Sequence, residues 1–139
     1  MPKDNKPGSD WSPLGHGALI VFVSSSGADA QAFRRLVGSS GQLVVNVPDL
    51  CGAIAVIERR RPDLVVCDTE IEGEGSWRDL LEMRQIDGML SLIVVSPDPD
   101  DRLRAEVLNL GGLGVLARPF RSEEVRRFIE IWQMIFCQR

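Results

Sequence analysis

The stretch Arg61-Pro-Asp-Leu-Val-Val-Cys-Asp68 holds four consecutive apolar residues between polar ends. A short apolar run without helical spacing is typical of a β-strand that is buried on both faces of a sheet. Pro62 prevents a preceding helix from continuing into the run. We therefore predict a central strand over 64–67, with Asp68 at its carboxyl end.

Similar apolar runs lie on both sides of this strand and alternate with segments of helical periodicity. They predict strands over 18–23, 43–47, 64–67, 92–95 and 114–117. The segments between them predict helices beginning near 28, 50, 77, 98 and 122, the fourth of which covers 98–110. Such alternation favours an α/β fold with a parallel sheet covered on both faces. We expect a flavodoxin-like, doubly wound (βα)5 arrangement in three layers.

Length and composition limit the organisation of the chain. Its 139 residues suffice for one domain, which we assign to 18–139, while the Pro- and Gly-containing segment 1–17 is expected to be a disordered arm. The net charge of −4 argues against a nucleic-acid partner. No apolar run reaches the ~18 residues of a membrane span. Three widely spaced cysteines fit a reducing, cytoplasmic location.

The residue types that are missing exclude several kinds of chemistry. The only lysines are Lys3 and Lys6, the only histidine is His16, and there is no tyrosine. The part of the chain that we expect to fold therefore lacks the histidine base and the lysine on which Ser-His-Asp hydrolysis, Schiff-base formation and P-loop phosphate binding depend. We expect a protein that is not an enzyme.

Polar residues follow four of the predicted strands. Ser24 to Ser26 follow the first, Asp68 the third, Ser96 the fourth and Arg118 the fifth. In a doubly wound sheet, the carboxyl ends of the strands meet at one edge, where ligands bind. We therefore expect these side chains to be neighbours.

Three stretches together resemble the receiver domain of two-component response regulators. They are Arg61 to Asp68, Leu92-Ile-Val-Val-Ser-Pro97, and Leu110-Gly-Gly-Leu-Gly-Val-Leu-Ala-Arg-Pro-Phe120. Their order and spacing carry the resemblance, which extends from Ala18 to about Phe136. It implies a phosphorelay signalling domain whose partners are a histidine kinase and a downstream target protein.

The resemblance also implies roles for single residues. Asp68 matches the aspartate that accepts a phosphoryl group, and Ser96 matches the hydroxyl residue that bonds to the phosphoryl oxygens. Pro119 matches a proline that usually follows a cis peptide bond. A carboxylate can act as this nucleophile only where a metal ion and a cation neutralise the phosphoryl charge.

The metal site departs from the family pattern. Family members carry an acidic pair after the first strand to hold Mg²⁺, and Ser24 and Ser25 stand at those positions. Mg²⁺ prefers carboxylate and water oxygens, so two hydroxyls are poor replacements. We expect no cofactor and no metal site, or a weak Mg²⁺ site built on Asp68 and Glu70.

Two further departures affect the cation and the switch. Arg118 replaces the family lysine, and a planar guanidinium favours a two-point pair with a carboxylate. We therefore expect Arg118 to hold Asp68 in a metal-free pocket. Val115 replaces the aromatic switch residue and has no ring to swing. These changes predict that phosphorylation is weak or lost, as in a pseudo-receiver.

The last helix is apolar on more than one side, which predicts a second burial partner. We expect a homodimer or target surface on the face formed by the fourth helix, fifth strand and fifth helix. The candidate residues are Val115, Val125, Phe128, Trp132 and Ile135.

A different function is also compatible with the residues after the first strand. The loop from Ser24 to Gly27 offers hydroxyls and backbone N–H groups at the start of a helix, where an anion can bind. This loop looks a little like the flavodoxin phosphate loop, so a small-ligand or nucleotide binder is the alternative.

Overall fold

The computed structural model describes residues 18–37, 43–87 and 91–137. They form one parallel sheet of five strands in the order β2-β1-β3-β4-β5. The expected flavodoxin-like arrangement is confirmed, and the expectation of a disordered arm over 1–17 concerns residues outside those described. The strands are β1 (Leu19–Val23), β2 (Leu43–Val47), β3 (Leu64–Asp68), β4 (Leu92–Ser96) and β5 (Gly114–Ala117).

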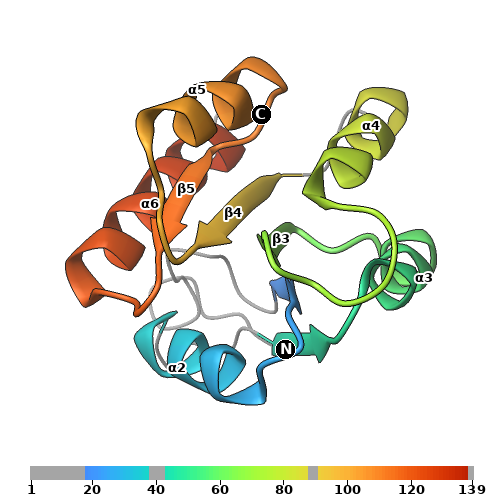
Figure 1. Ribbon diagram of the computed structural model, residues 1–139, viewed down its shortest axis with the longest axis horizontal. Helices are drawn as coiled ribbons and strands as arrows, with labels where there is room; N and C mark the ends of the chain where they lie inside the picture. The colour runs from blue at the N-terminus through green and yellow to red at the C-terminus, as the bar shows by residue number, and fades with distance from the viewer. Residues whose placement is uncertain (1–17, 38–42, 88–90, 138–139) are drawn as a thin grey trace, which may run out of the picture.

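In the described residues, five helices cover the two faces of the sheet (Figure 1). They are α2 (Gly27–Val37), α3 (Leu50–Arg60), α4 (Trp77–Asp87), α5 (Asp101–Asn109) and α6 (Ser122–Cys137). Helices α2 and α6 pack on one face, while α3, α4 and α5 pack on the other. This is the three-layer architecture that the alternation of strands and helices predicts.

The core consists of two apolar clusters, one on each face of the sheet. Successive strand residues point to opposite faces, so the continuous apolar runs of β1, β3 and β4 serve both clusters. On the α2 and α6 side, Phe22, Phe33 and Trp132 are fully buried. On the other side, the buried residues include Trp77 and Leu80 of α4.

Several boundaries differ from the sequence-based expectation. Asp68 and Ser96 are the last residues of β3 and β4, because ladder hydrogen bonds continue one position further than the apolar runs. Helix α5 starts at Asp101 and not at Asp98. The reason is that the Asp98 N–H donates to Ser96 Oγ at 3.1 Å, and Asp100 is the residue that caps the helix.

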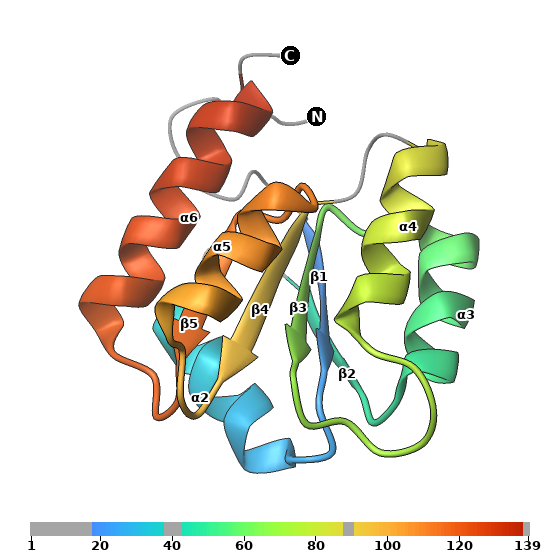
Figure 2. The ribbon, with the colours of Figure 1, turned by 45° about the horizontal axis from the view of Figure 1, so that its top comes forward.

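All five strands end at the same edge of the sheet, at the lower side of Figure 2. The loops that follow β1, β3, β4 and β5 therefore lie at this edge, where the polar residues singled out in the sequence are found.

Candidate functional site

The acceptor pocket, as we call the surroundings of Asp68, lies at the carboxyl ends of β1, β3 and β5. It brings together Ser24, Asp68 and Arg118, as the topology predicts. Asp68 is only 2% exposed, and Ser24 is also buried. The pocket thus places a carboxyl group and a guanidinium where water has little access.

Both carboxylate oxygens of Asp68 accept hydrogen bonds. Oδ1 accepts from the Glu70 N–H at 2.9 Å and from Arg118 Nη2 at 3.1 Å. Oδ2 accepts from Ser24 Oγ at 3.3 Å. Ser24, which we expected at the first position of the family's acidic pair, is therefore a donor to Asp68, whereas a carboxylate there would repel it.

Burial is the main influence on the protonation of Asp68. Desolvation raises the pKa of this carboxyl above its ordinary value of 3.8. The Glu70 N–H bond, the Arg118 charge and the Ser24 hydroxyl lower the pKa, but they do not fully offset the desolvation. The Arg118 pairing therefore compensates only part of the free energy that burying this charge costs.

Arg118 does not pair with Asp68 in the two-point way that we expected from its planar shape. Only Nη2 contacts Asp68, while Nη1 donates to Asp29 Oδ2 at 3.2 Å. Nη2 also lies 3.4 Å from an oxygen of Glu70, whose side chain is largely exposed. The guanidinium is thus shared among three carboxylates, because Asp68 is not the lone acid that the sequence suggested.

Asp29 is the member of the site that sequence reasoning missed. Ser26 caps α2 by accepting the Asp29 N–H at 3.2 Å, which places Asp29 in the first helical turn, beside the pocket. An acidic residue in a first turn is commonly explained by the helix dipole alone. No signal in the sequence separates Asp29 from any other acid in the first turn of a helix.

The remaining predicted site residues lie around the pocket with different contacts. Ser96 is buried, but its Oγ accepts the Asp98 N–H, and no hydrogen bond joins it to Asp68 within the described residues. Ser25 is exposed beside Ser24. The peptide bond between Arg118 and Pro119 is cis, the isomer that the resemblance implies for this position.

The donor set does not fit a resident Mg²⁺ ion. The Asp68 oxygens already accept from the Glu70 N–H, from the Arg118 guanidinium and from the Ser24 hydroxyl. In the described part of the chain, no group of three acidic, histidine or cysteine residues is arranged to hold a metal. A magnesium ion needs near-octahedral oxygen ligation and prefers carboxylates, and the Ser24 hydroxyl is a neutral oxygen that already accepts the Ser26 N–H.

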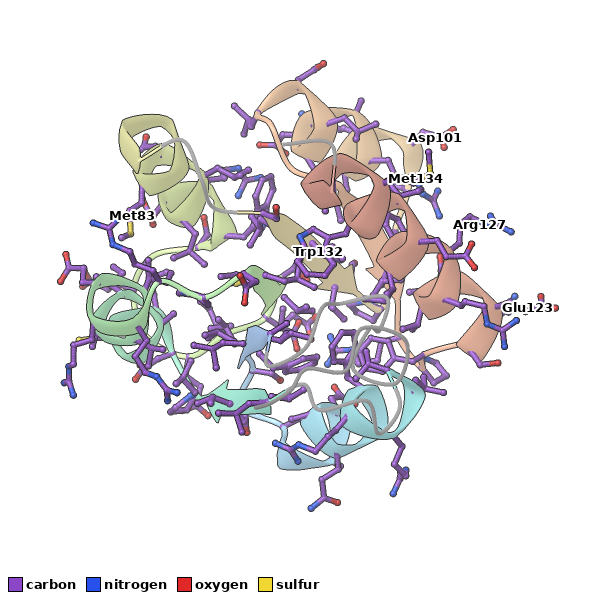
Figure 3. All side chains as sticks on the ribbon, turned by 180° about the vertical axis from the view of Figure 1, so that it is seen from behind. Met83, Asp101, Glu123, Arg127, Trp132 and Met134 are labelled. Atoms are coloured by element: carbon purple, nitrogen blue, oxygen red, sulfur yellow. The ribbon has the colours of Figure 1, made fainter. Side chains whose placement is uncertain are left out.

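The predicted partner face is corrected by burial. Val115, Val125 and Trp132 are 3%, 1% and 1% exposed, so their side chains belong to the core and cannot form a contact surface. Phe128 is partly buried against the same cluster, and the Ile135 side chain lies outside the described residues. Figure 3 shows Trp132 directed from α6 toward the sheet.

The loop from Ser24 to Gly27, which we considered as an anion-binding site, makes hydrogen bonds within the chain itself. Ser24 Oγ bonds to Asp68 and accepts the Ser26 N–H, and Ser26 Oγ caps α2. Two of its three hydroxyls therefore satisfy groups of the protein itself, which leaves anion binding at Ser24 to Gly27 without a supporting contact. In addition, none of the described helices is long and apolar enough to cross a membrane.

Comparison with known proteins places this geometry in a family. The model of the response regulator receiver domain matches residues 20–130. Over 74 residues the chain is 31% identical to sporulation initiation phosphotransferase F of Bacillus subtilis (strain 168). That match covers 53% of this chain and 60% of the relative, so it spans less than two thirds of that protein.

Solved structures agree on the fold. The signal receiver domain of a Luxo repressor protein from Vibrio parahaemolyticus superimposes with a TM-score of 0.76 at 18% identity, over 86% of this chain and 92% of that one. A chemotaxis response regulator of Vibrio cholerae gives 0.71 at 16% identity, over 84% and 98%. The five-stranded parallel sheet and the match to the family model lead to one conclusion: the chain belongs to the family of response regulator receiver domains.

Proposed function

We propose that this domain is a pseudo-receiver, which signals through protein contacts while Asp68 is held by Arg118 instead of being phosphorylated. The observation that carries the proposal is the pairing of Arg118 Nη2 with Asp68 Oδ1 at 3.1 Å in a pocket that does not fit Mg²⁺. A carboxylate whose lone pairs are engaged by donors is a poor nucleophile, and phosphoryl transfer without metal lacks its main charge stabilisation. The proposed partners are a histidine kinase or a downstream target in a cytoplasmic pathway.

The test is incubation of the purified protein with acetyl phosphate and Mg²⁺, followed by intact-mass measurement. We expect no species heavier by one phosphoryl group, because Arg118 occupies the Asp68 carboxylate and no acidic pair recruits the metal. Asp68→Asn is the matched control for phosphorylation elsewhere. A stoichiometric adduct in the unaltered protein that is absent from Asp68→Asn would overturn the proposal.

The contact surface that we propose lies on the outer side of α6. Ile131 and Met134 are 39% and 63% exposed and stand three positions apart, so they share one side of the helix. Figure 3 shows Met134 projecting away from the sheet. These two residues replace the buried ones as candidates, because apolar side chains that stay exposed on a helix are typical of an interface.

Self-association through this surface is testable by sedimentation. If the partner is a second copy, the sedimentation coefficient rises with protein concentration, and Met134→Glu removes the rise because a charge would be buried at the interface. The exposed Leu43 on β2 supplies the control, since Leu43→Glu leaves α6 intact. A monomer at all concentrations would exclude a second copy as the partner of this surface.

A further inference from the structure

The acceptor pocket contains a positive charge that belongs to the chain itself. Arg118 follows β5, and its guanidinium contacts side chains from α2, from β3 and from the loop after β3. In this position it lies among three carboxylates, of which those of Asp29 and Asp68 are 22% and 3% exposed. Two of these acids are thus largely withdrawn from water, so their charges require compensation by the protein.

Asp29 is essential to this arrangement because it fixes the direction of the guanidinium. The two terminal nitrogens of Arg118 contact different acids, Nη1 with Asp29 at 3.2 Å and Nη2 with Asp68 at 3.1 Å. A guanidinium is planar, so anchoring both nitrogens fixes its plane as well as its position. The contact with Glu70 at 3.4 Å is longer and more exposed, and it adds little to this constraint.

Asp29 is the first acidic residue after the positions where the family carries its acidic pair. The loop after β1 carries hydroxyls at Ser24 and Ser25, where the family has an acidic pair, and the next acid in the sequence is Asp29. Its carboxylate contacts Arg118 from α2. The Arg118 guanidinium therefore links an acid of α2, Asp29, to the acid at the end of β3, Asp68. In the family pattern, a metal ion would link the acids of these two segments.

We propose that Arg118 is the resident cation of the acceptor pocket and that Asp29 is the positioning residue that holds it against Asp68. This inference rests on the proposed function, because it supplies the reason why the pocket needs no metal. It makes the folded state independent of divalent cations. It also means that Arg118 alone keeps Mg²⁺ or Mn²⁺ from changing the stability of the protein.

The experiment compares thermal unfolding in EDTA with unfolding in Mg²⁺ or Mn²⁺. The unaltered protein is expected to have the same Tm in both. Arg118→Ala leaves Asp29 and Asp68 without their shared counter-charge, so its Tm is expected to be lower in EDTA and to rise with Mg²⁺ or Mn²⁺, as linkage requires of an ion that binds only the folded state. In Asp29→Asn/Arg118→Ala the rise is expected to be much smaller, because one of the two freed acids is gone. Asp29→Glu/Arg118→Ala is expected to keep most of the rise.

Arg127→Ala is the matched control, since Arg127 projects from the outer side of α6 (Figure 3). It is expected to behave as the unaltered protein in both solutions. The proposal is overturned if the unaltered protein is itself stabilised by Mg²⁺, if Arg118→Ala is as stable as Arg127→Ala in EDTA, or if the ion response of Arg118→Ala does not depend on Asp29.

A second measurement keeps the proposal testable where Arg118→Ala does not fold. Lysine carries a compact ammonium on a flexible stem and lacks the rigid planar fork that holds two acids in fixed directions. Asp29→Asn is therefore expected to reduce the stability of the unaltered protein more than that of Arg118→Lys in urea unfolding. Equal effects in the two backgrounds would overturn the positioning role. The outcome is separable from that of the proposed function, which is decided by the phosphoryl adduct and not by stability.

Discussion

Replacing Trp132 with alanine is expected to lower the free energy of unfolding by about 3–5 kcal/mol, the range for a fully buried tryptophan. Trp132 is 1% exposed and belongs to the cluster between α6 and the sheet. The loss combines the transfer of a large apolar side chain with the cavity that remains. Because a domain is stabilised by only about 5–15 kcal/mol, the variant would be close to unfolding at ordinary temperature.

Urea unfolding monitored by far-UV circular dichroism measures this effect. Ile131→Ala is the matched control, because Ile131 is the adjacent residue of the same helix and is 39% exposed. Its loss is expected to be well below that of Trp132→Ala, since little apolar surface leaves the core. Equal losses in the two variants would show that Trp132 is not a core residue and would restore it as a contact residue.

Replacing Asp68 with asparagine is expected to stabilise the protein at neutral pH, because the raised pKa of Asp68 means that the folded state disfavours its charge, and an amide of the same shape carries none. The amide oxygen can still accept from the Glu70 N–H and Arg118, and the amide nitrogen can donate to the Ser24 hydroxyl. Arg118 also keeps its contact with Asp29. The variant therefore removes the desolvation cost of the Asp68 charge without opening the pocket.

The stabilisation expected from Asp68→Asn depends on pH in a direction that can be tested. Because the pKa of Asp68 is raised in the folded state, its penalty is absent below the ordinary pKa of 3.8 and grows as the pH rises through the folded value. The stability difference between Asp68→Asn and the unaltered protein is expected to be largest near neutral pH and to vanish in acid. Urea unfolding across this range measures it, with the exposed Asp101→Asn as control. A destabilised Asp68→Asn at neutral pH would show that Arg118 more than compensates the burial.

The fold could be predicted from the sequence because each strand carries its own signal. Four apolar residues before Asp68 and continuous runs in β1 and β4 can only be buried between two layers of helices. The site residues at strand ends followed from the same topology. The start of α5 was misplaced because Asp98 and Asp100 are equally good caps by residue type, and only the Ser96 contact distinguishes them.

The site contacts were less predictable because they depend on directions that residue types do not specify. Nothing in the spacing of Asp29 distinguishes a helix-dipole acid from a partner of Arg118 in a loop 89 positions away. The surface of α6 was misjudged for a different reason. Val125, Ile129 and Trp132 recur at helical spacing, so the sequence indicates that they share one side of the helix, and the error was to assign residues of this buried side to a contact face.

The contacts of Arg118 with two acids that lie far from it in the sequence also have a consequence for the order of folding events. Its contacts with Asp29 and Asp68 close chain segments of 89 and 50 positions, among the longest-range polar contacts in the described residues. Contacts of such separation are formed after local structure during folding, since the loop entropy must be overcome first. We therefore expect the pocket to be among the last features to assemble, and its ion pairs to act mainly by slowing unfolding. A chain that ended before β5 would lack the cation, so the assembled pocket is a property of the complete domain.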